Sequence, residues 1–147
     1  MIKILTTIFI LIYGFTFGQE FSYPKINKQG KDINNFIPDG WLLLDSTRGD
    51  LNKDNHNDLV LISQHKDSVL VINKNLEYID SVITQPRVLI ILFYNQRTNQ
   101  YHLVEQSKSF ILNHNNANMD DPYQDISIEK GILKIEFHIF MNMGGWD

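Results

Sequence analysis

The chain has 147 residues, with 13 lysines and arginines against 17 aspartates and glutamates, and it contains no cysteine. This length is typical of one ordinary domain, and the 43% hydrophobic content is sufficient for a buried core. The formal net charge of -4 argues against a nucleic-acid partner, because such proteins carry a clustered positive surface. Without cysteine, disulfides, thiolate metal sites and a cysteine nucleophile are excluded.

The first 18 residues have the three-part pattern of a secretory signal peptide. A basic start at Lys3 precedes an uncharged apolar run over 4–17, and the small residues Thr16 and Gly18 precede a cut before Gln19. The run is shorter than the roughly 20 residues that a membrane span needs, so we expect no stable span after cleavage. We therefore predict a secreted, periplasmic or cell-envelope protein whose fold excludes residues 1–18.

The remaining chain has the pattern of a β protein. Residues 19–40 are polar and are interrupted by proline, glycine and asparagine, which predicts an extended lead-in. Short runs of Val, Ile and Leu then alternate with turn residues, which predicts an all-β, mainly antiparallel sheet or sandwich in a single domain over 41–147. The predicted strands are 41–45, 59–63, 69–73, 87–94, 101–106, 110–113, 126–129 and 132–140.

Local signals refine this pattern. The run 87–94 is the most apolar, which predicts a central strand buried on both faces. The segments 95–99 and 129–131 have the length and residue types of hairpin turns, the second with glycine where a left-handed residue is needed. Residues 74–84 fit either a short helix or a strand.

The C-terminal run 132–140 alternates apolar and polar residues, which places Lys134, Glu136 and His138 on the more exposed face. Residues 141–147 then resemble a turn toward a further strand that the sequence does not contain. We expect either a sheet edge here or a C-terminally truncated chain, and an unpaired apolar edge favours association.

One acidic loop indicates a metal site. Residues 49–60 read GDLNKDNHNDLV, with oxygen-bearing side chains at alternate positions. Hard cations such as Ca²⁺ take six to eight oxygen ligands, which such side chains supply if the loop curls around one point. The predicted ligands are the side chains of Asp50, Asn52, Asp54 and Asp58 and the backbone carbonyl of His56. The loop is not an EF-hand, because Asn55 replaces the turn glycine and Leu61 replaces the final glutamate.

This stretch resembles the calcium loop of FG-GAP/VCBS-type repeats, in which an acidic loop of this spacing joins two strands. The wider chain is also similar to a group of small secreted bacterial proteins of unknown function that have one such loop. Their pattern is matched by 121–128 (DPYQDISI) and by 144–146 (GGW). The resemblance implies one structural Ca²⁺ and no propeller, since a propeller needs several blades. A solvated acidic turn remains the alternative, because Asp, Asn and Lys are ordinary turn residues.

An interaction module is a second class of function that the sequence leaves open. Trp41, Tyr94, Tyr123 and Trp146 would present an aromatic surface to a glycan or protein partner if they shared one face. Aromatic residues of this spacing also serve as ordinary core or edge packing, so the sequence does not separate the two uses.

A small hydrolase is the third class. The polar loop 113–125 contains His114 with Asp120 and Asp121, which are residue types suited to acid and base catalysis. The chain has no zinc-protease spacing of histidines, nucleophile elbow, P-loop or dinucleotide motif. We assign no catalytic residue, and the sequence favours a non-enzymatic domain with structural Ca²⁺.

The signal peptide predicts a defined mature N-terminus. Expressed in a Gram-negative host, the exported protein should begin at Gln19 when measured by intact-mass spectrometry, and Ile8→Asp should block export because a charge interrupts the apolar run. An exported chain that retains residues 1–18 would contradict the prediction.

Overall fold

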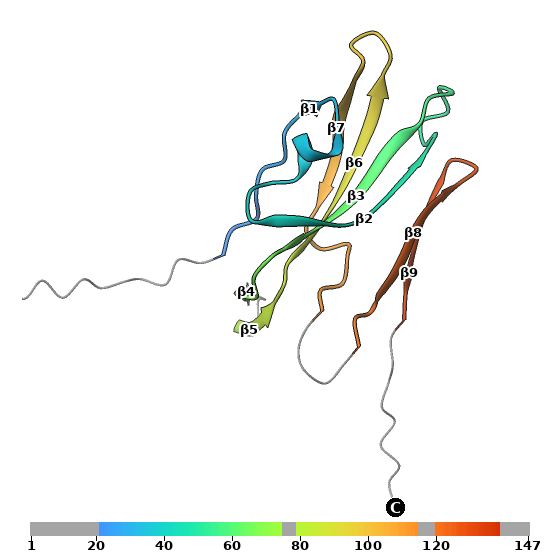
Figure 1. The fold of residues 1–147 in the computed structure, drawn as a ribbon. Helices are drawn as coiled ribbons and strands as arrows, with labels where there is room; N and C mark the ends of the chain where they lie inside the picture. Colours follow the sequence, from blue (N-terminus) through green and yellow to red (C-terminus); the bar gives the residue numbers. More distant parts are fainter. Residues whose placement is uncertain (1–20, 75–78, 115–119, 139–147) are drawn as a thin grey trace, which may run out of the picture.

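The computed structural model describes residues 21–74, 79–114 and 120–138, and it confirms the predicted all-β fold (Figure 1). Within these ranges no helix is long and apolar enough to cross a membrane. The predicted signal peptide over 1–18 and the segment 139–147 lie outside the described residues.

A five-stranded antiparallel sheet forms the centre, in the order β1-β7-β6-β3-β2. Its strands are β1 (Gln29–Gly30), β2 (Trp41–Gly49), β3 (Asp58–His65), β6 (Arg87–Asn95) and β7 (Gln100–Ser107). Two separate hairpins are formed by β4 (Val69–Lys74) with β5 (Ile79–Thr84) and by β8 (Tyr123–Glu129) with β9 (Ile132–Phe137). A 3-10 helix, η1 (Ile33–Phe36), precedes β2.

The central strands β3 and β6 are buried on both faces, as predicted for 87–94. Successive side chains of a strand point to opposite faces, so each strand contributes to two cores. In β3, Leu59 and Leu61 join one core, whereas Val60 and Ile62 join the other. The sheet therefore needs a cover on each face.

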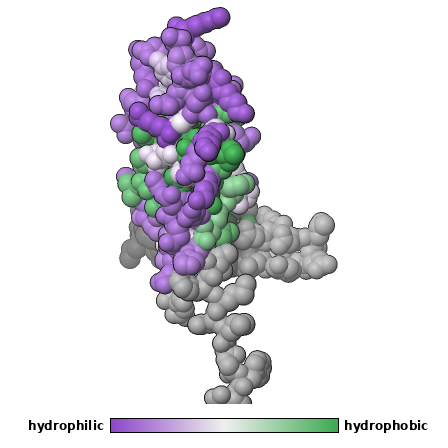
Figure 2. All heavy atoms as spheres, turned by 90° about the vertical axis from the view of Figure 1, so that its right-hand side faces the viewer, coloured by the Kyte–Doolittle hydropathy of each residue, from purple (hydrophilic) through white to green (hydrophobic). Residues whose placement is uncertain are grey.

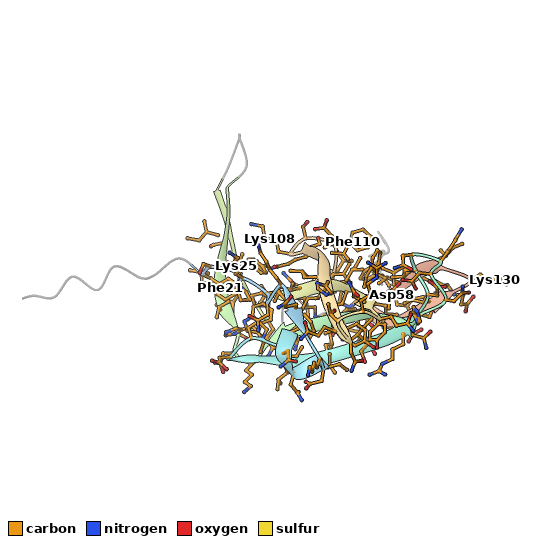
Figure 3. All side chains as sticks on the ribbon, turned by 90° about the horizontal axis from the view of Figure 1, so that it is seen from above. Phe21, Lys25, Asp58, Lys108, Phe110 and Lys130 are labelled. Atoms are coloured by element: carbon orange, nitrogen blue, oxygen red, sulfur yellow. The ribbon has the colours of Figure 1, made fainter. Side chains whose placement is uncertain are left out.

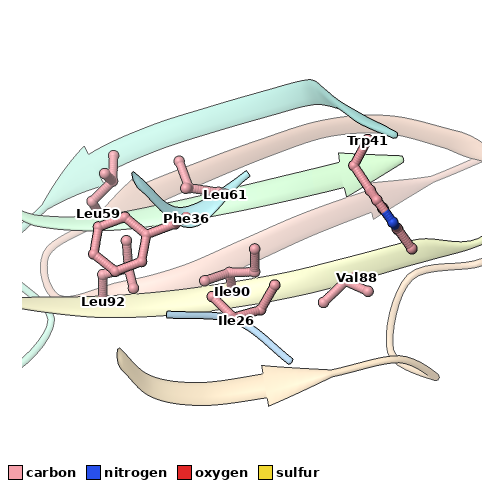
Figure 4. Close-up of a cluster of buried hydrophobic side chains, with 8 residues drawn as sticks. All are labelled: Ile26, Phe36, Trp41, Leu59, Leu61, Val88, Ile90 and Leu92. Atoms are coloured by element: carbon pink, nitrogen blue, oxygen red, sulfur yellow. The ribbon is translucent and has the colours of Figure 1, made fainter. Parts of the chain in front are cut away.

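The N-terminal segment covers the first face. Figure 4 shows Ile26, Phe36 and Trp41 packed against the leucines, isoleucine and valine of β3 and β6. The helix η1 that carries Phe36 is capped by Asp32, whose carboxylate accepts the Asn34 N–H at 2.8 Å. The predicted lead-in thus adds buried side chains to the core, which its polar composition did not indicate.

The β8–β9 hairpin covers the second face. Tyr123 and Ile126 of β8 pack against β3 and β6, and β8 passes close to the end of β2. A Cβ added at Gly49 would lie 2.5 Å from Ile128 Cγ2, so only glycine allows this approach. The predicted turn at 129–131 is confirmed, since Lys130 and Gly131 have φ of 52° and 76°, as a two-residue type I′ turn requires.

One predicted strand is absent from the structure, and the segment predicted as either a helix or a strand contains a strand. Residues 110–113 do not form the predicted strand, because the Leu112 carbonyl and the Asn113 side chain bond to Arg87 instead of to a neighbouring strand. Within 74–84, residues 79–84 form a strand, and the hairpin that they complete projects away from the sheet in Figures 1 and 3.

A buried arginine joins the second layer to the sheet. The Arg87 side chain is 1% exposed, donates from Nη1 to Asp121 Oδ1 at 2.8 Å and pairs through Nη2 with Oδ2 of the same carboxylate. Its Nε donates to Gln64 Oε1 at 2.8 Å, and its Cζ lies 5.9 Å from the centre of the Tyr123 ring. The Tyr123 hydroxyl in turn donates to Asp45 Oδ2 at 2.6 Å, which ties β8 to β2.

Burial alone would raise the pKa of Asp121, but the hydrogen bond from Arg87, the Tyr123 backbone N–H and the Arg87 charge outweigh it and lower the pKa. A carboxyl with a lowered folded-state pKa stabilises the fold above its unfolded pKa of 3.8, and this contribution is lost as the pH falls through the folded-state pKa.

The ion pair predicts an acid-sensitive contribution to stability. Asp121→Asn should lower the free energy of unfolding by about 2 kcal/mol at pH 7, because a buried guanidinium loses its charged partner. The difference from the natural chain should shrink in urea unfolding measured below pH 3.8. Asp125→Asn, at an exposed position of the strand β8 that follows Asp121, is the matched control. A pH-independent difference for Asp121→Asn would contradict the assignment.

Candidate metal centre

The predicted metal loop connects β2 to β3 at one end of the sheet, beside the β6–β7 turn (Figure 1). Gly49 pairs with Asp58, so the strand ladder holds the two ends of the loop together. Figure 2 shows that this end of the molecule, at the top of the view, is covered by hydrophilic residues. The loop therefore lies at a hydrophilic end of the molecule, and the pairing of Gly49 with Asp58 fixes the distance between its two ends.

Three predicted ligand side chains gather inside the turn. The Asp54 backbone N–H donates both to Asp50 Oδ1 and to Asn52 Oδ1, each at 3.0 Å, so these two oxygens lie at most 6.0 Å apart. Asn52 Nδ2 donates to Asp54 Oδ2 at 3.0 Å, which brings the third side chain to the same place. Asp50 Oδ2 also accepts the Asn55 N–H at 2.9 Å. These hydrogen bonds bring the side chains of Asp50, Asn52 and Asp54 together within the turn.

Two left-handed residues make this convergence possible. Lys53 and Asn55 have φ of 64° and 68°, which reverses the chain twice within three residues. Asparagine adopts this region more readily than most residues, and Asn55 occupies the place of the glycine in an EF-hand loop. The sharp turn expected at Asn55 is therefore present without glycine.

Asp58 has a role that the spacing did not predict. Its side chain is completely buried, and Oδ2 accepts the N–H groups of Leu51 at 2.9 Å and Asn52 at 3.2 Å. Its Oδ1 accepts the Tyr94 N–H at 3.0 Å, across the boundary to β6. In Figure 3, Asp58 lies well inside the outline of the molecule, whereas Lys130 is at its edge. The carboxylate therefore joins the loop to the sheet through three charge-assisted hydrogen bonds.

His56 connects the loop to the next turn. Its backbone N–H donates to Asp54 Oδ1 at 2.9 Å, and its ring Nε2 lies 3.1 Å from Gln96 Oε1. The ring centre is 5.8 Å from that of Tyr94. These contacts hold the His56 backbone, and with it the predicted carbonyl ligand, against the β6–β7 turn.

The donor set matches the chemistry of a hard cation. Two oxygens that bind one Ca²⁺ at 2.3–2.6 Å are at most about 5 Å apart. The shared Asp54 N–H limits the distance between Asp50 Oδ1 and Asn52 Oδ1 only from above. Among the residues that the structure describes, no group of three or more His, Cys, Asp or Glu is arranged to hold a metal ion. The hydrogen bonds agree with this, since Asp58 is directed to backbone amides and one gathered side chain is an asparagine.

The aromatic residues predicted as an interaction surface do not share one face. Trp41 belongs to the first core and Tyr123 to the second, and both are buried. Tyr94 is half-buried against Tyr101, with ring centres 5.4 Å apart. Trp146 lies outside the described residues.

The residues predicted for a hydrolase are only partly placed, because 115–119 lie outside the described residues. Asp121 is paired with the buried Arg87, as described above, and the His114 carbonyl accepts the Thr84 hydroxyl at 3.1 Å. The Asp121 carboxylate therefore has a structural partner, and Asp120 is exposed.

The Asp58 hydrogen bonds predict a large effect of removing one charge. In Asp58→Asn, an amide N–H₂ replaces one acceptor oxygen and faces a backbone N–H, so at least one buried donor loses its partner. We expect the free energy of unfolding to fall by about 2–4 kcal/mol in urea denaturation.

Asn57→Ala, at the exposed neighbouring position, is the control and should change stability by less than about 0.5 kcal/mol. Equal stability of the two variants would show that Asp58 does not anchor the loop.

Comparison of the chain with protein-family models, with curated proteins and with solved structures gives no match. The resemblance to FG-GAP/VCBS-type loops is carried by the residues of the loop themselves and stays a prediction. The local geometry described above, rather than kinship, is the basis for the function proposed next.

Proposed function

We propose that the protein is an exported, non-enzymatic β domain that binds one structural Ca²⁺ in the loop 50–58. The observation that supports this most directly is the Asp54 N–H, which is shared by Asp50 Oδ1 and Asn52 Oδ1 at 3.0 Å each. The hydrogen bonds to this N–H hold two oxygen-bearing side chains in the same turn, and such ordering would lower the entropic cost of binding a cation there.

The proposed ligands are the side chains of Asp50, Asn52, Asp54 and Asp58 and the backbone carbonyl of His56. Asp58 Oδ1 accepts a single N–H, so it retains capacity for a further bond. A bound Ca²⁺ would supply positive charge among carboxylates that otherwise repel one another. The role is structural, because the loop closes β2 onto β3 and contacts the β6–β7 turn through Asp58 and His56.

The expected energetic effect is modest. Extracellular calcium modules bind with dissociation constants of about 10⁻⁴–10⁻³ M. At millimolar Ca²⁺ and a dissociation constant near 10⁻⁴ M, ligand linkage adds roughly 1.4 kcal/mol to the stability of the folded state. For a domain of this size, that corresponds to a rise in melting temperature of roughly 3–6 °C.

A thermal melt in Ca²⁺ and in EDTA tests the proposal. The chain lacking residues 1–18 should melt about 3–6 °C higher in millimolar Ca²⁺ than in EDTA. Asp54→Ala should abolish this difference, because it removes one of the gathered oxygens. Asn55→Gly should tighten binding measured by calorimetry, because glycine adopts the left-handed turn without strain.

The matched control is Asp67→Ala, which removes an exposed carboxylate outside the loop and should leave the Ca²⁺ response intact. Mg²⁺ at the same concentration should give a smaller shift, because it prefers rigid octahedral sites and keeps its water. Identical melting curves in Ca²⁺ and EDTA would overturn the proposal.

A further inference from the structure

Among the described residues the sheet ends at β2 on one side, which pairs only with β3, and at the short strand β1 on the other. On its outer side β7 pairs with the two described residues of β1, which lie opposite Tyr101 and His102. One more backbone contact follows, from the Leu103 N–H to the Lys28 carbonyl at 2.8 Å. In the described part of the chain no strand lies along residues 104–107 of this edge.

A hollow of about 630 Å³ lies along this edge, lined by residues 102–106 together with Lys28 and Lys108. The pairing of β6 with β7 shifts register at Val104, between Leu103 and Glu105, so the hollow follows an irregular stretch of β7. The N-terminal segment has turned onto the first face here, where Gln106 Nε2 donates to the Pro24 carbonyl at 2.8 Å. The edge of β7 is thus left open beside it.

The Glu105 side chain of β7 accepts a backbone hydrogen bond that a neighbouring strand would otherwise accept. The Gln106 backbone N–H donates to Glu105 Oε1 at 2.9 Å, although a carbonyl of a neighbouring strand is the usual partner of such a donor. Val104, which lies at the register shift of β7, is 50% exposed. An incoming backbone carbonyl could therefore replace the Glu105 carboxylate without leaving a polar group unpaired.

The charge around this edge is opposite to that of the whole chain. The segment 21–31 contains Lys25, Lys28 and Lys31 and no acidic residue, within a protein of formal net charge -4. Lys28 and Lys108 line the hollow, and the Lys108 Nζ lies 5.6 Å from the centre of the Tyr23 ring. Figure 3 labels Lys25 and Lys108 close together in that view. Glu105 is the single carboxylate among the lining residues.

We propose that the outer edge of β7 binds an extended acidic peptide of a partner protein by strand addition. The peptide continues the line of β1 antiparallel to β7, and its backbone pairs with residues 104–107. Lys28 and Lys108 are about five strand residues apart along the edge, roughly 17 Å. The peptide therefore places an acidic side chain near each end and small β-branched residues beside Val104.

The probe is the synthetic peptide acetyl-DVTVTD-amide, titrated into the ¹⁵N-labelled chain lacking residues 1–18 and followed by the amide shifts of residues 104–107. Lys28→Glu with Lys108→Glu should weaken binding about tenfold or more, because two attractive contacts become repulsive. Glu105→Ala should strengthen binding a few-fold, because it frees the Gln106 N–H and removes the single acidic side chain of the hollow. Arg48→Glu, on the opposite edge strand β2, is the matched control and should not change binding.

Two further peptides separate strand addition from charge attraction alone. A version of the probe with alternate N-methyl groups should not bind, because its backbone cannot pair, and the charge-reversed acetyl-KVTVTK-amide should bind weakly. Equal binding of the N-methylated probe, shifts confined to other strands, or no binding at millimolar probe would overturn the proposal. A dimer in sedimentation that Lys28→Glu disrupts would also overturn it, by making a second copy the occupant. Repeating the titration in EDTA keeps this result independent of calcium.

Discussion

The antiparallel pairing of β3 with β6 is the constraint on which the rest of the molecule depends. Both strands are apolar along most of their length and are buried on both faces, so the sheet is stable only when each face is covered. The N-terminal segment with η1 provides one cover and the β8–β9 hairpin provides the other. Neither cover has a core of its own, so each is ordered by the apolar surface that the central pair presents.

The paired strands β3 and β6 also carry two buried charged side chains, Asp58 and Arg87, one at each end of the pair. Asp58 begins β3 and accepts hydrogen bonds from three backbone N–H groups, and Arg87 begins β6 and is paired with Asp121. Antiparallel strands that begin with Asp58 and Arg87 place these charges at opposite ends of the sheet. Asp58 orders the acidic loop, and Arg87 orders the segment that leads into the second cover. The polar groups thus fix the register of the covers on a core that is otherwise apolar, since each charge must find its own partners.

Much of the fold was predictable because its information is local. Apolar runs bounded by turn residues identified four of the five strands of the sheet, all except the two-residue β1, and the glycine of 129–131 identified a hairpin turn. The errors arise where distant residues determine the outcome. Residues 110–113 are apolar enough for a strand, but the Leu112 carbonyl is taken by a guanidinium 25 residues away. The same limit applies to the hydrogen bond that Asp58 accepts from the Tyr94 N–H, because its donor lies 36 residues away and the spacing of the loop did not reveal it.

The two proposed functional surfaces lie on the same sheet but at different places: the calcium loop at one end of β2 and β3, and the peptide site along the outer edge of β7. The loop 50–58 lies at a polar end of the sheet, where β2 and β3 are already joined and a cation would only tighten an existing turn. The edge of β7 is open because β1 pairs with only two of its residues before the chain crosses onto the first face. Because β6 and β3 separate β7 from β2, a peptide on β7 need not touch the acidic loop. The central pair does link the two sites, through the Asp58 contact with Tyr94 in β6 and the pairing of Tyr94 with Tyr101 in β7.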